Sequence, residues 1–366
     1  MSKLEELIQQ YCPDGVEYKP LGDYLSYEQP TKYLVVNTKY DDSYLTPVLT
    51  AGQSFILGYT NEKEGIFQAS KDVPVIIFDD FTTSFHWVDF SFKVKSSAMK
   101  MLRPIDEKKA LFRYLFYCMK NILYVPGDHT RQWIGTYSQF EIPVPPLPVQ
   151  EEIVRILDNF TELQAELQAE LQKRLQQYNY YRDNLLSFEG RTDVKYLPIK
   201  EVLKIKNGRD YKHLGEGSVP VYGSGGIMTY VDTAVYDKPS VLIPRKGSID
   251  KLYYVDKPFW NVDTVFYTEI NKSILVEKYL FYLLQKEHLE RLNTAGGVPS
   301  LTQAVLNEVI ISIPALEEQK RIVSILDRFE ALTNDLTAGL PAEIEKRRQQ
   351  YEFYRDKLLT FKRKAA

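Results

Sequence analysis

The chain is poor in cysteine and histidine. Two cysteines, Cys12 and Cys118, are too few for a disulfide framework or a multi-cysteine metal site, and they suit a reducing compartment. The histidines are scattered along the chain, with no pair at helical i,i+4 spacing: His86, His129, His213 and His288. We therefore predict no zinc site.

Long hydrophobic runs are also missing. No stretch approaches the ~18 uninterrupted apolar residues of a membrane-spanning helix. The start, MSKLEELIQQYCPDG, carries no basic segment leading into an apolar run, so no signal peptide is expected. We expect a cytoplasmic protein without membrane contact.

Motifs for nucleotide binding and catalysis are absent as well. The sequence has no G-x-x-x-x-G-K-[ST] loop, no G-x-G-x-x-G after a predicted strand, and no Asn-Pro-Pro-aromatic or Asp-Pro-Pro-aromatic tetrapeptide of the amino-methyltransferases. Asp128–His129 is better interpreted as a turn than as an acid–base pair, and Asp79–Asp80 as a hydrogen-bonding strand end than as a metal site. We expect a recognition and assembly protein with no catalytic residues, no metal and no cofactor of its own.

Neither sign of charge dominates. The 46 Lys and Arg residues nearly balance the 49 Asp and Glu residues, which excludes a protein coated in basic charge but permits a local basic stripe. With 44% apolar and 26% charged residues the chain is typical of a soluble globular protein. Its 366 residues predict two or three domains.

What the chain does contain is an internal repeat. QQYNYYRDNLLSF at 176–188 returns as QQYEFYRDKLLTF at 349–361, and PPLPVQEEIVRILDNFTEL at 145–163 returns as PALEEQKRIVSILDRFEAL at 314–332. The two offsets are 173 and 169 residues, so the second copy is four residues longer, about one helical turn. The chain is therefore expected to be a duplication with a pseudo-two-fold arrangement.

The repeated segments have the pattern of long helices. Apolar residues from Phe160 to Tyr178 recur every three or four positions, and TELQAELQAELQ contains only helix formers. A helix over 150–188 would be about 58 Å long. The two copies most simply pair as an antiparallel coiled coil, although each could instead pack on its own globular block.

The second helix is expected to be interrupted. Gly339 and Pro341 lie inside it, and an interior proline costs ~3 kcal/mol or more. We predict a kink or break near 339–341, with Pro341 at the start of a new helix.

The remaining segments predict two α+β blocks. Strand-like runs in the first are 33–36, 73–78 and 85–94, followed by a helix near 106–122; the second has VPVYG, SVLIP, KLYYV and TVFYTEI, a helix near 276–291, and VIISIP. The expected organisation is a first block over 1–147, a helical spacer over 148–190, a second block over 191–315 and a second spacer over 316–366.

Several loops of the second block suit an anionic ligand, though each alone is a weak signal. They are YGSGG at 222–226, PRKGS at 244–248, NTAGGVPSLT at 293–302 and KIKNGRDYKH at 204–213. The corresponding loops of the first block are LTAGQS at 49–54, DDFTTSFHW at 79–87 and GDHTRQW at 127–133. Their polar side chains, including Gln53, could contact base edges or phosphates.

The whole layout resembles the specificity (S, HsdS) subunit of type I restriction–modification systems. The resemblance rests on the helix starts IPVPPLPVQEEIVRILDNF and IISIPALEEQKRIVSILDRF, the two YRD-LL-F helix ends and the tetrapeptide run. Within the blocks, VPVYGSGGI, VLIPRKGSID, PFWNVDTVF and TPVLTAGQSFILGYT resemble phrases of that family's target-recognition domains. The resemblance covers essentially the entire chain.

The resemblance implies that each block is a target-recognition domain that reads one half of a bipartite double-stranded DNA site, while the coiled coil sets the gap between the halves. It also implies two docked methyltransferase (M) subunits, with restriction (R) subunits joining the full complex. S-adenosylmethionine, ATP and Mg²⁺ would belong to those partners. The chain itself would perform no chemistry.

The candidate residues follow from these loops and helices. For DNA contact in the second block we select Arg245, Lys246, Ser248, Tyr222, Ser224, Arg209, Ser300 and Thr302, and in the first block Thr82, Thr83, His86, Arg131 and Gln132. For subunit docking we select Tyr178, Tyr180 and Arg182 with their repeats Tyr351, Phe353 and Arg355. Two alternatives stay open: a protein-binding adapter built on duplicated domains, and an enzyme with an unrecognised nuclease or methyltransferase site.

Overall fold

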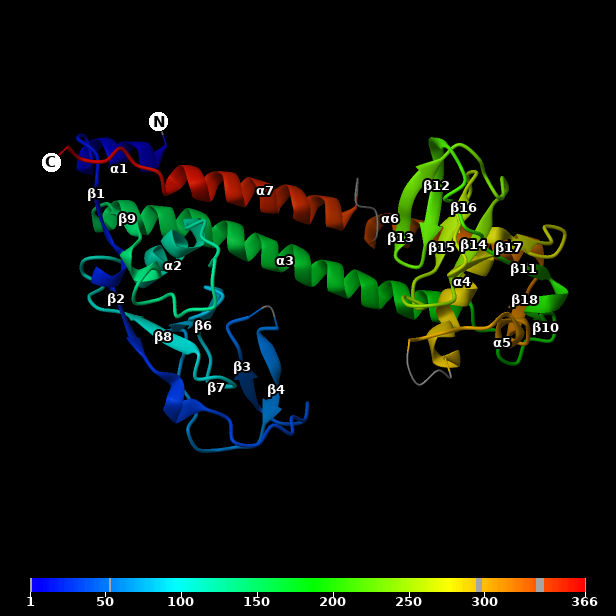
Figure 1. Cartoon of the computed structure of the whole chain (residues 1–366), viewed down its shortest axis with the longest axis horizontal. Coiled ribbons are helices and arrows are strands. Elements are labelled where there is room, and N and C mark those ends of the chain that lie inside the picture. The colour runs from blue at the N-terminus through cyan, green and yellow to red at the C-terminus, as the bar shows by residue number, and fades with distance from the viewer. Residues whose placement is uncertain (1, 53, 294–297, 334–338, 366) are drawn as a thin grey trace. The chain divides into compact units, whose positions relative to one another are not determined.

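The computed structural model describes residues 2–52, 54–293, 298–333 and 339–365. The chain divides into two compact units: unit 1 comprises Met1–Glu166 and Glu345–Ala366, and unit 2 comprises Leu167–Ile344. The helix α3 (Leu147–Leu185) runs for 39 residues and contributes to both units (Figure 1). Each unit combines helices with antiparallel-rich sheets, which confirms the predicted α+β class.

The described residues of unit 1 form three small sheets. Their strand orders are β1-β9, β2-β8-β5-β6 and β4-β3-β7. The strands are β1 (Glu17–Pro20), β2 (Leu25–Glu28), β3 (Thr46–Leu49), β4 (Ile56–Thr60), β5 (Val75–Asp79), β6 (Phe85–Val88), β7 (Lys93–Val94), β8 (Met99–Pro104) and β9 (Glu141–Val144). The helices other than α3 are α1 (Lys3–Tyr11), α2 (Phe112–Asn121) and part of α7 (Leu340–Leu358).

Unit 2 repeats this connectivity. Its strand orders are β10-β18, β11-β17-β14-β15 and β13-β12-β16, which correspond one for one to those of unit 1. The strands are β10 (Lys195–Pro198), β11 (Leu203–Asn207), β12 (Glu216–Gly223), β13 (Gly226–Val231), β14 (Ser240–Pro244), β15 (Tyr253–Val255), β16 (Trp260–Asn261), β17 (Val265–Ile270) and β18 (Ile310–Ile313). Besides parts of α3 and α7, its described residues form the helices α4 (Glu277–Lys286), α5 (Gln303–Asn307) and α6 (Leu316–Thr333).

The central strands explain why these sequences form sheets. The first four residues of β5 are buried, and so are all five of β14. Both strands have a hydrogen-bonded neighbour on each side, so no edge is left exposed. A continuous apolar run is the expected signature of a strand that is covered on both faces.

A buried glutamine fixes the start of each spacer helix. Gln150 Oε1 accepts the backbone N–H of Leu111, 2.9 Å away, just before α2. Gln319 Oε1 accepts the backbone N–H of Val276, 2.8 Å away, just before α4. The amide groups of both glutamines also donate to backbone carbonyls near the end of the preceding strand, those of Pro145 and Pro314. This motif is the physical reason for the Gln in both proline-led helix starts.

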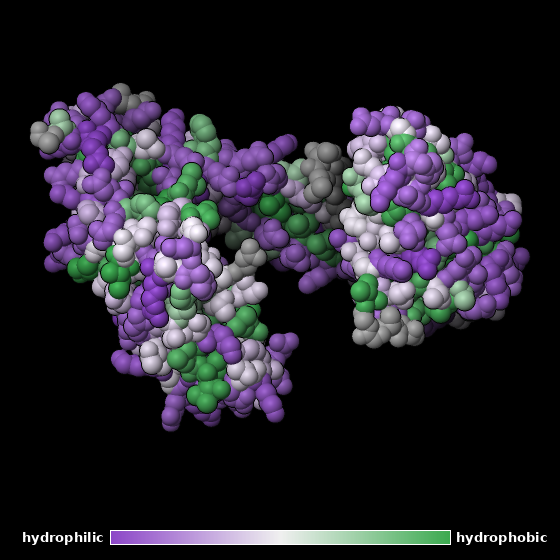
Figure 2. Space-filling model, viewed as in Figure 1, coloured by the Kyte–Doolittle hydropathy of each residue, from purple (hydrophilic) through white to green (hydrophobic). Residues whose placement is uncertain are grey.

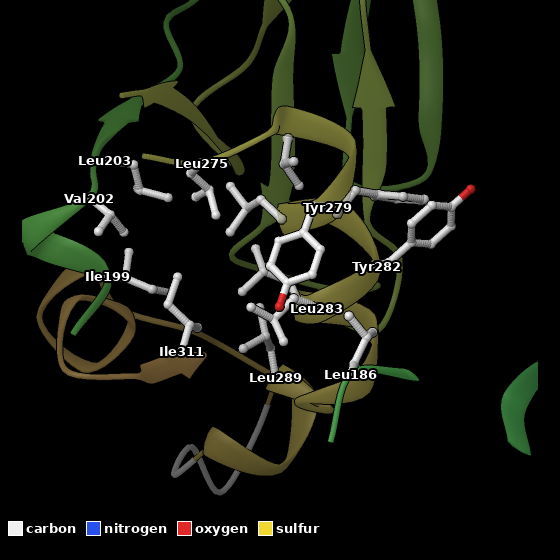
Figure 3. Packing of buried hydrophobic residues seen from close by; sticks show 14 of the residues in the cluster. Leu186, Ile199, Val202, Leu203, Leu275, Tyr279, Tyr282, Leu283, Leu289 and Ile311 are labelled. Carbon is white, nitrogen blue, oxygen red and sulfur yellow. The ribbon is translucent and has the colours of Figure 1, made fainter. Parts of the chain in front are cut away.

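The helices α2 and α4 each contain a tyrosine that is buried in the core of its unit. In unit 2, Figure 3 shows Tyr279 of α4 among apolar side chains from other elements, including Ile199 of a 3-10 turn and Ile311 of β18. Its hydroxyl donates to the carbonyl of Ser312 on β18. Tyr114 of α2 makes the same bond to Pro143 on β9 in unit 1. The two units therefore share one core design.

The spacer helices form an aromatic pair in each unit. In unit 1, residues 345–358 of α7 run antiparallel to the first half of α3 (Figure 1), and Phe160 stacks on Tyr354 with ring centroids 5.4 Å apart. In unit 2, Tyr181 of α3 stacks on Phe329 of α6 at 5.3 Å. These are equivalent positions of the internal repeat.

The described residues of the second spacer form two helices. α6 ends at Thr333 and α7 begins at Leu340, with Pro341 in the first turn of α7. Proline is tolerated there because the first helical N–H groups have no intrahelical acceptor. Residues 334–338 lie outside the described residues.

Two strand predictions for unit 1 were wrong in detail. The run at 33–36 forms no strand: it follows a 3-10 turn (Pro30–Tyr33) and only Leu34 makes an isolated bridge, to Val94. The run at 85–94 divides into β6 and β7, which lie in different sheets. Apolar content alone does not indicate where a strand changes sheets.

Candidate nucleic-acid interface

The predicted loops of unit 2 meet at one place, which we call the unit 2 loop cluster (residues 207–212, 222–226, 244–248, 261–264 and 299–302). Lys246 pairs with Ser300 in an antiparallel bridge, and Arg245 is held by both neighbours: its N–H donates to Thr264 and its carbonyl accepts from Leu301. The N–H of Arg209 donates to the carbonyl of Asn261, 2.9 Å away. Residues 294–297 of the predicted loop at 293–302 lie outside the described residues.

Arg245 is the best-positioned cation of this cluster. Its guanidinium lies over the ring of Phe266 at 4.9 Å, and its Nη1 donates to Asn207 Oδ1 at 3.3 Å. Its Nε is buried and has no hydrogen-bond partner among the described residues, and no ion pair with Asp250 is found there. A half-buried arginine that is oriented but not neutralised keeps donors available for a bidentate acceptor such as guanine.

A wide depression lies beside this cluster. It measures about 930 Å³ and is lined by both polar and apolar residues, among them Lys212, Ser224, Met228 and Thr264. Gly247 of the 244–248 loop has φ +77° and lies close to Ser224 of this lining, because a Cβ on Gly247 would lie 3.4 Å from Ser224 Oγ. The left-handed backbone explains the glycine at this turn.

The other predicted residues of unit 2 have mixed surroundings. Lys246 is exposed and Ser248 half-buried. Thr302 caps α5, where its hydroxyl accepts the N–H of Val305. Tyr222 is half-buried against Tyr253, and burial raises its pKa.

The described parts of the predicted unit 1 loops also meet, in what we call the unit 1 loop cluster (residues 50–52, 54, 79–86 and 127–133). The N–H of Gln132 donates to the carbonyl of Asp80 at 2.8 Å, and His86 Nε2 lies 3.0 Å from the carbonyl of Gly52. Phe81 stacks on His129 with ring centroids 4.5 Å apart. Gln53 lies outside the described residues.

A buried carboxylate organises the unit 1 loop cluster. Asp80 is 1% exposed, lies 3.3 Å from the ammonium of buried Lys100, and accepts the N–H of Trp133 at 2.9 Å. Arg131, which is exposed, reaches the same carboxylate at 3.6 Å. These contacts give Asp80 a structural role, in agreement with its interpretation as a hydrogen-bonding strand end.

The unit 1 candidates therefore differ in accessibility. Thr82 and Arg131 are exposed. Gln132 is 2% exposed. Its amide accepts a hydrogen bond from Tyr124 and donates to Asp128 and Thr130, so its polar groups are used within the protein in this structure. Thr83 is buried at φ +58°, and half-buried His86 stacks on Phe55, with its pKa lowered by burial.

The docking candidates separate into buried and exposed members. Tyr178 and Arg182 are buried, and the Tyr178 hydroxyl donates to Gln285. Their repeats Tyr351 and Arg355 are half-buried and lie against each other, as Tyr178 and Arg182 do. Tyr180 and Phe353 are exposed by 67% and 62%, so of these six candidates they present the largest apolar surface outward.

Sequence reasoning missed the residues that support Arg245. Asn207 and Phe266 lie on β11 and β17, far from Arg245 in the sequence. No local pattern could have indicated these contacts, because they form only once the sheet has assembled.

Two possible features are not found. None of the helices among the described residues has the length and hydropathy to cross a membrane. Within the same residues, no three His, Cys, Asp or Glu side chains gather to hold a metal ion.

Comparison with known proteins defines the class. The family model "Type I restriction modification DNA specificity domain" matches twice, over residues 13–177 and 192–346. The chain belongs to this family, and recognition of a DNA target is the function that defines it.

Individual relatives agree with this assignment. The chain is similar to the Escherichia coli "Type I restriction enzyme EcoR124I/EcoR124II specificity subunit", with 43% identity over 403 aligned residues that cover 99% of this chain and 97% of the relative. It is 31% identical to a putative type I restriction enzyme specificity subunit of Haemophilus influenzae, covering 84% of this chain and 86% of the relative. The fold is similar to the crystal structure of the S subunit of the type I restriction–modification system from M. genitalium, with TM-score 0.62, 15% identity, and 94% and 96% of the two chains covered.

Proposed function

We propose that the two units read the two halves of a bipartite DNA site. The observation that carries this proposal is that the family model falls once on each half of the repeat, while the loop clusters of the two units differ. Unit 1 has the buried Asp80 directly after β5, and unit 2 has the half-exposed Arg245 directly after the equivalent strand β14. Similar scaffolds with different loops suit two different target sequences.

Within this proposal the accessible candidates make the DNA contacts. In unit 2 these are Arg245, Lys246, Ser248, Ser224, Arg209, Tyr222, Ser300 and Thr302. In unit 1 they are Thr82 and Arg131, with His86, Thr83 and Gln132 contributing mainly by shaping the cluster. The nearly balanced charge of the chain predicts that partner subunits supply part of the phosphate contact.

The spacer helices are proposed to set the gap between the half-sites and to dock two methyltransferase subunits. The fold is similar to that of a chain solved under the description "Structural basis underlying complex assembly andconformational transition of the type I R-M system", with TM-score 0.53 and 17% identity. Exposed Tyr180 and Phe353, at equivalent positions of the repeat, are suited to two equivalent docking contacts. Restriction subunits would join this assembly, which acts in the cytoplasm.

In this division of labour the chain performs no chemistry. S-adenosylmethionine, ATP and Mg²⁺ would act on the partner subunits. The support is the family assignment to a DNA specificity function together with the absence of a nucleotide-binding or methyltransferase motif in the sequence.

The test is to map modified bases in cells that express this chain with its methyltransferase subunit and in cells that lack this chain. We expect methylation at one bipartite sequence, only when the chain is present. A continuous site, or a map unchanged by loss of the chain, would contradict the proposal. A protein-binding adapter would give the second of these results.

A further inference from the structure

The two units contain the same β-hairpin beside their loop clusters. β3 and β4 form it in unit 1, and β12 and β13 in unit 2. Each hairpin has a register shift at the equivalent place, between Val48 and Leu49 and between Val221 and Tyr222. Bulges of this kind redirect side chains and are frequent next to functional sites.

The second strand of each hairpin presents an exposed apolar pair. β4 and β13 are edge strands. Ile56 and Leu57 on β4 are 42% and 37% exposed, and Ile227 and Met228 on β13 are 50% and 57% exposed. Leu57 and Met228 have no partner residue in the register of the neighbouring strand: they are the extra residues of the two bulges, so the regular alternation of faces does not hold there and both apolar residues of each pair are exposed.

Such an edge is unusual in a folded protein. Exposed apolar edge strands invite non-native pairing, and proteins normally protect them with charge or proline. Figure 2 shows a surface on which hydrophilic residues prevail and hydrophobic residues gather in separate patches. Retention of an apolar pair at the same place in two units whose loops have otherwise diverged indicates a partner that covers it.

The surroundings of the pair identify the class of partner. In unit 2, Ile227 and Met228 line the 930 Å³ depression together with Lys212, Ser224 and Thr264 of the loop cluster. Two carboxylates, those of Asp210 and Asp263, also line it, and a carboxylate can accept a hydrogen bond from the N4 amino group of cytosine. In unit 1, Phe55, the residue before Ile56, stacks on His86 of the loop cluster at 4.5 Å. A cation and hydroxyl groups next to apolar side chains match a nucleic-acid groove, where polar base edges and phosphates surround one apolar group.

That apolar group is the 5-methyl of thymine in the major groove, a groove wide enough for a two-stranded β-ribbon. We propose that Ile227 and Met228 in unit 2, and Ile56 and Leu57 in unit 1, contact thymine methyl groups of the DNA target. Each half-site must then contain at least one A·T pair that is recognised through its methyl group. This inference rests on the DNA-reading role proposed above.

The test uses the full chain assembled with its methyltransferase subunit and the DNA site found by methylation mapping. Each thymine of the site is replaced singly by deoxyuridine, which removes only the methyl group, and the affinity is measured by fluorescence anisotropy. We expect at least one replacement in each half-site to weaken binding about fourfold, the effect of losing one buried methyl-sized contact.

Variants assign the effect to the hairpins. I227A/M228A should abolish the methyl dependence in one half-site only, and I56A/L57A in the other half-site only. Ile310→Ala, at a 54% exposed apolar residue on β18 of unit 2, is the matched control and should leave the methyl dependence intact. All four residues of the pairs are exposed, so thermal unfolding should be nearly unchanged and would reveal any variant that does not fold.

The outcomes separate this inference from the proposed function. If the complex binds no specific DNA, the proposed function fails. If it binds a specific site that lacks A·T pairs in one half, or shows no methyl dependence, or keeps that dependence in the hairpin variants, only this inference is overturned. Loss of assembly with the methyltransferase subunit in the hairpin variants would instead identify the pairs as a protein contact and would also overturn it.

Discussion

At the residue scale, Asp80 and Arg245 show how one scaffold carries two different surfaces. Each residue follows the last position of an equivalent central strand. The Asp80 carboxylate is neutralised internally by Lys100, whereas the Arg245 guanidinium is oriented by Asn207 and Phe266 and is not paired with an acid among the described residues. The same backbone site therefore stabilises unit 1 and is free to act in recognition in unit 2.

Arg245→Ala is expected to weaken binding of the complex to its DNA site by about 1–3 kcal/mol, the range for one bidentate base contact, which is roughly 5- to 150-fold. Methylation mapping should show relaxed specificity at one base pair in one half-site. Arg245→Lys should not restore specificity, because an ammonium has no planar fork. Arg328→Ala, at an exposed arginine of α6, is the control and should leave the DNA affinity unchanged. An equal loss of affinity in the Arg245→Ala and Arg328→Ala variants would contradict a base contact by Arg245.

A second residue-scale prediction concerns Glu152. Its side chain is 3% exposed and accepts hydrogen bonds from Arg155 and Lys3, and the bond from Arg155 is the main reason that its pKa falls to about 2. A lowered pKa stabilises the fold above the unfolded value near 4.5, and that contribution is lost as the pH falls toward 2. Because both cations are exposed, we expect the contribution to be only about 1 kcal/mol.

Glu152→Gln should therefore lower the free energy of unfolding of unit 1 by about 1 kcal/mol at pH 7. The difference from the unsubstituted chain should shrink between pH 4.5 and pH 2, since the substituted amide does not titrate. Denaturant unfolding at about pH 7 and about pH 3 measures both values. A difference that is independent of pH would show that the carboxylate charge is not the stabilising feature.

At the element scale, α3 is proposed to determine the gap between the half-sites. Deletion of residues 164–167 removes four residues, about 6 Å of helix, against roughly 3.4 Å per base pair. We expect the deleted chain to modify a site whose gap differs by about one or two base pairs. Gln164→Ala with Glu166→Ala keeps the length and should keep the gap; an unchanged gap in the deletion variant would contradict the ruler.

Periodicity made the helices predictable, and long-range contacts limited the rest. The spacing from Phe160 to Tyr178 was sufficient to predict α3, and Pro341 to place a helix start close to Leu340. The burial of Gln132 depends on Tyr124 and Asp128, so a loop that reads as polar in sequence turned partly inward. Ile227 and Met228 look like core residues of a strand, and only the edge position of β13 reveals their exposure.

At the scale of the whole molecule, the repeat of connectivity matters more than any single contact. Both units use equivalent strand orders, the same buried glutamine at the start of the spacer helix and the same tyrosine bond to the last strand. The two units differ in the residues of their loop clusters. Each unit is therefore expected to determine its own half of the target independently.

Exchange of one unit's block tests that independence most directly. Residues 191–315 are replaced by the equivalent block of another member of the family, and the modified sites are mapped in cells that contain the methyltransferase subunit. We expect one half-site to change, while the other half-site and the gap stay as they were. A map in which both halves change, or in which neither does, would contradict independent reading by the two units.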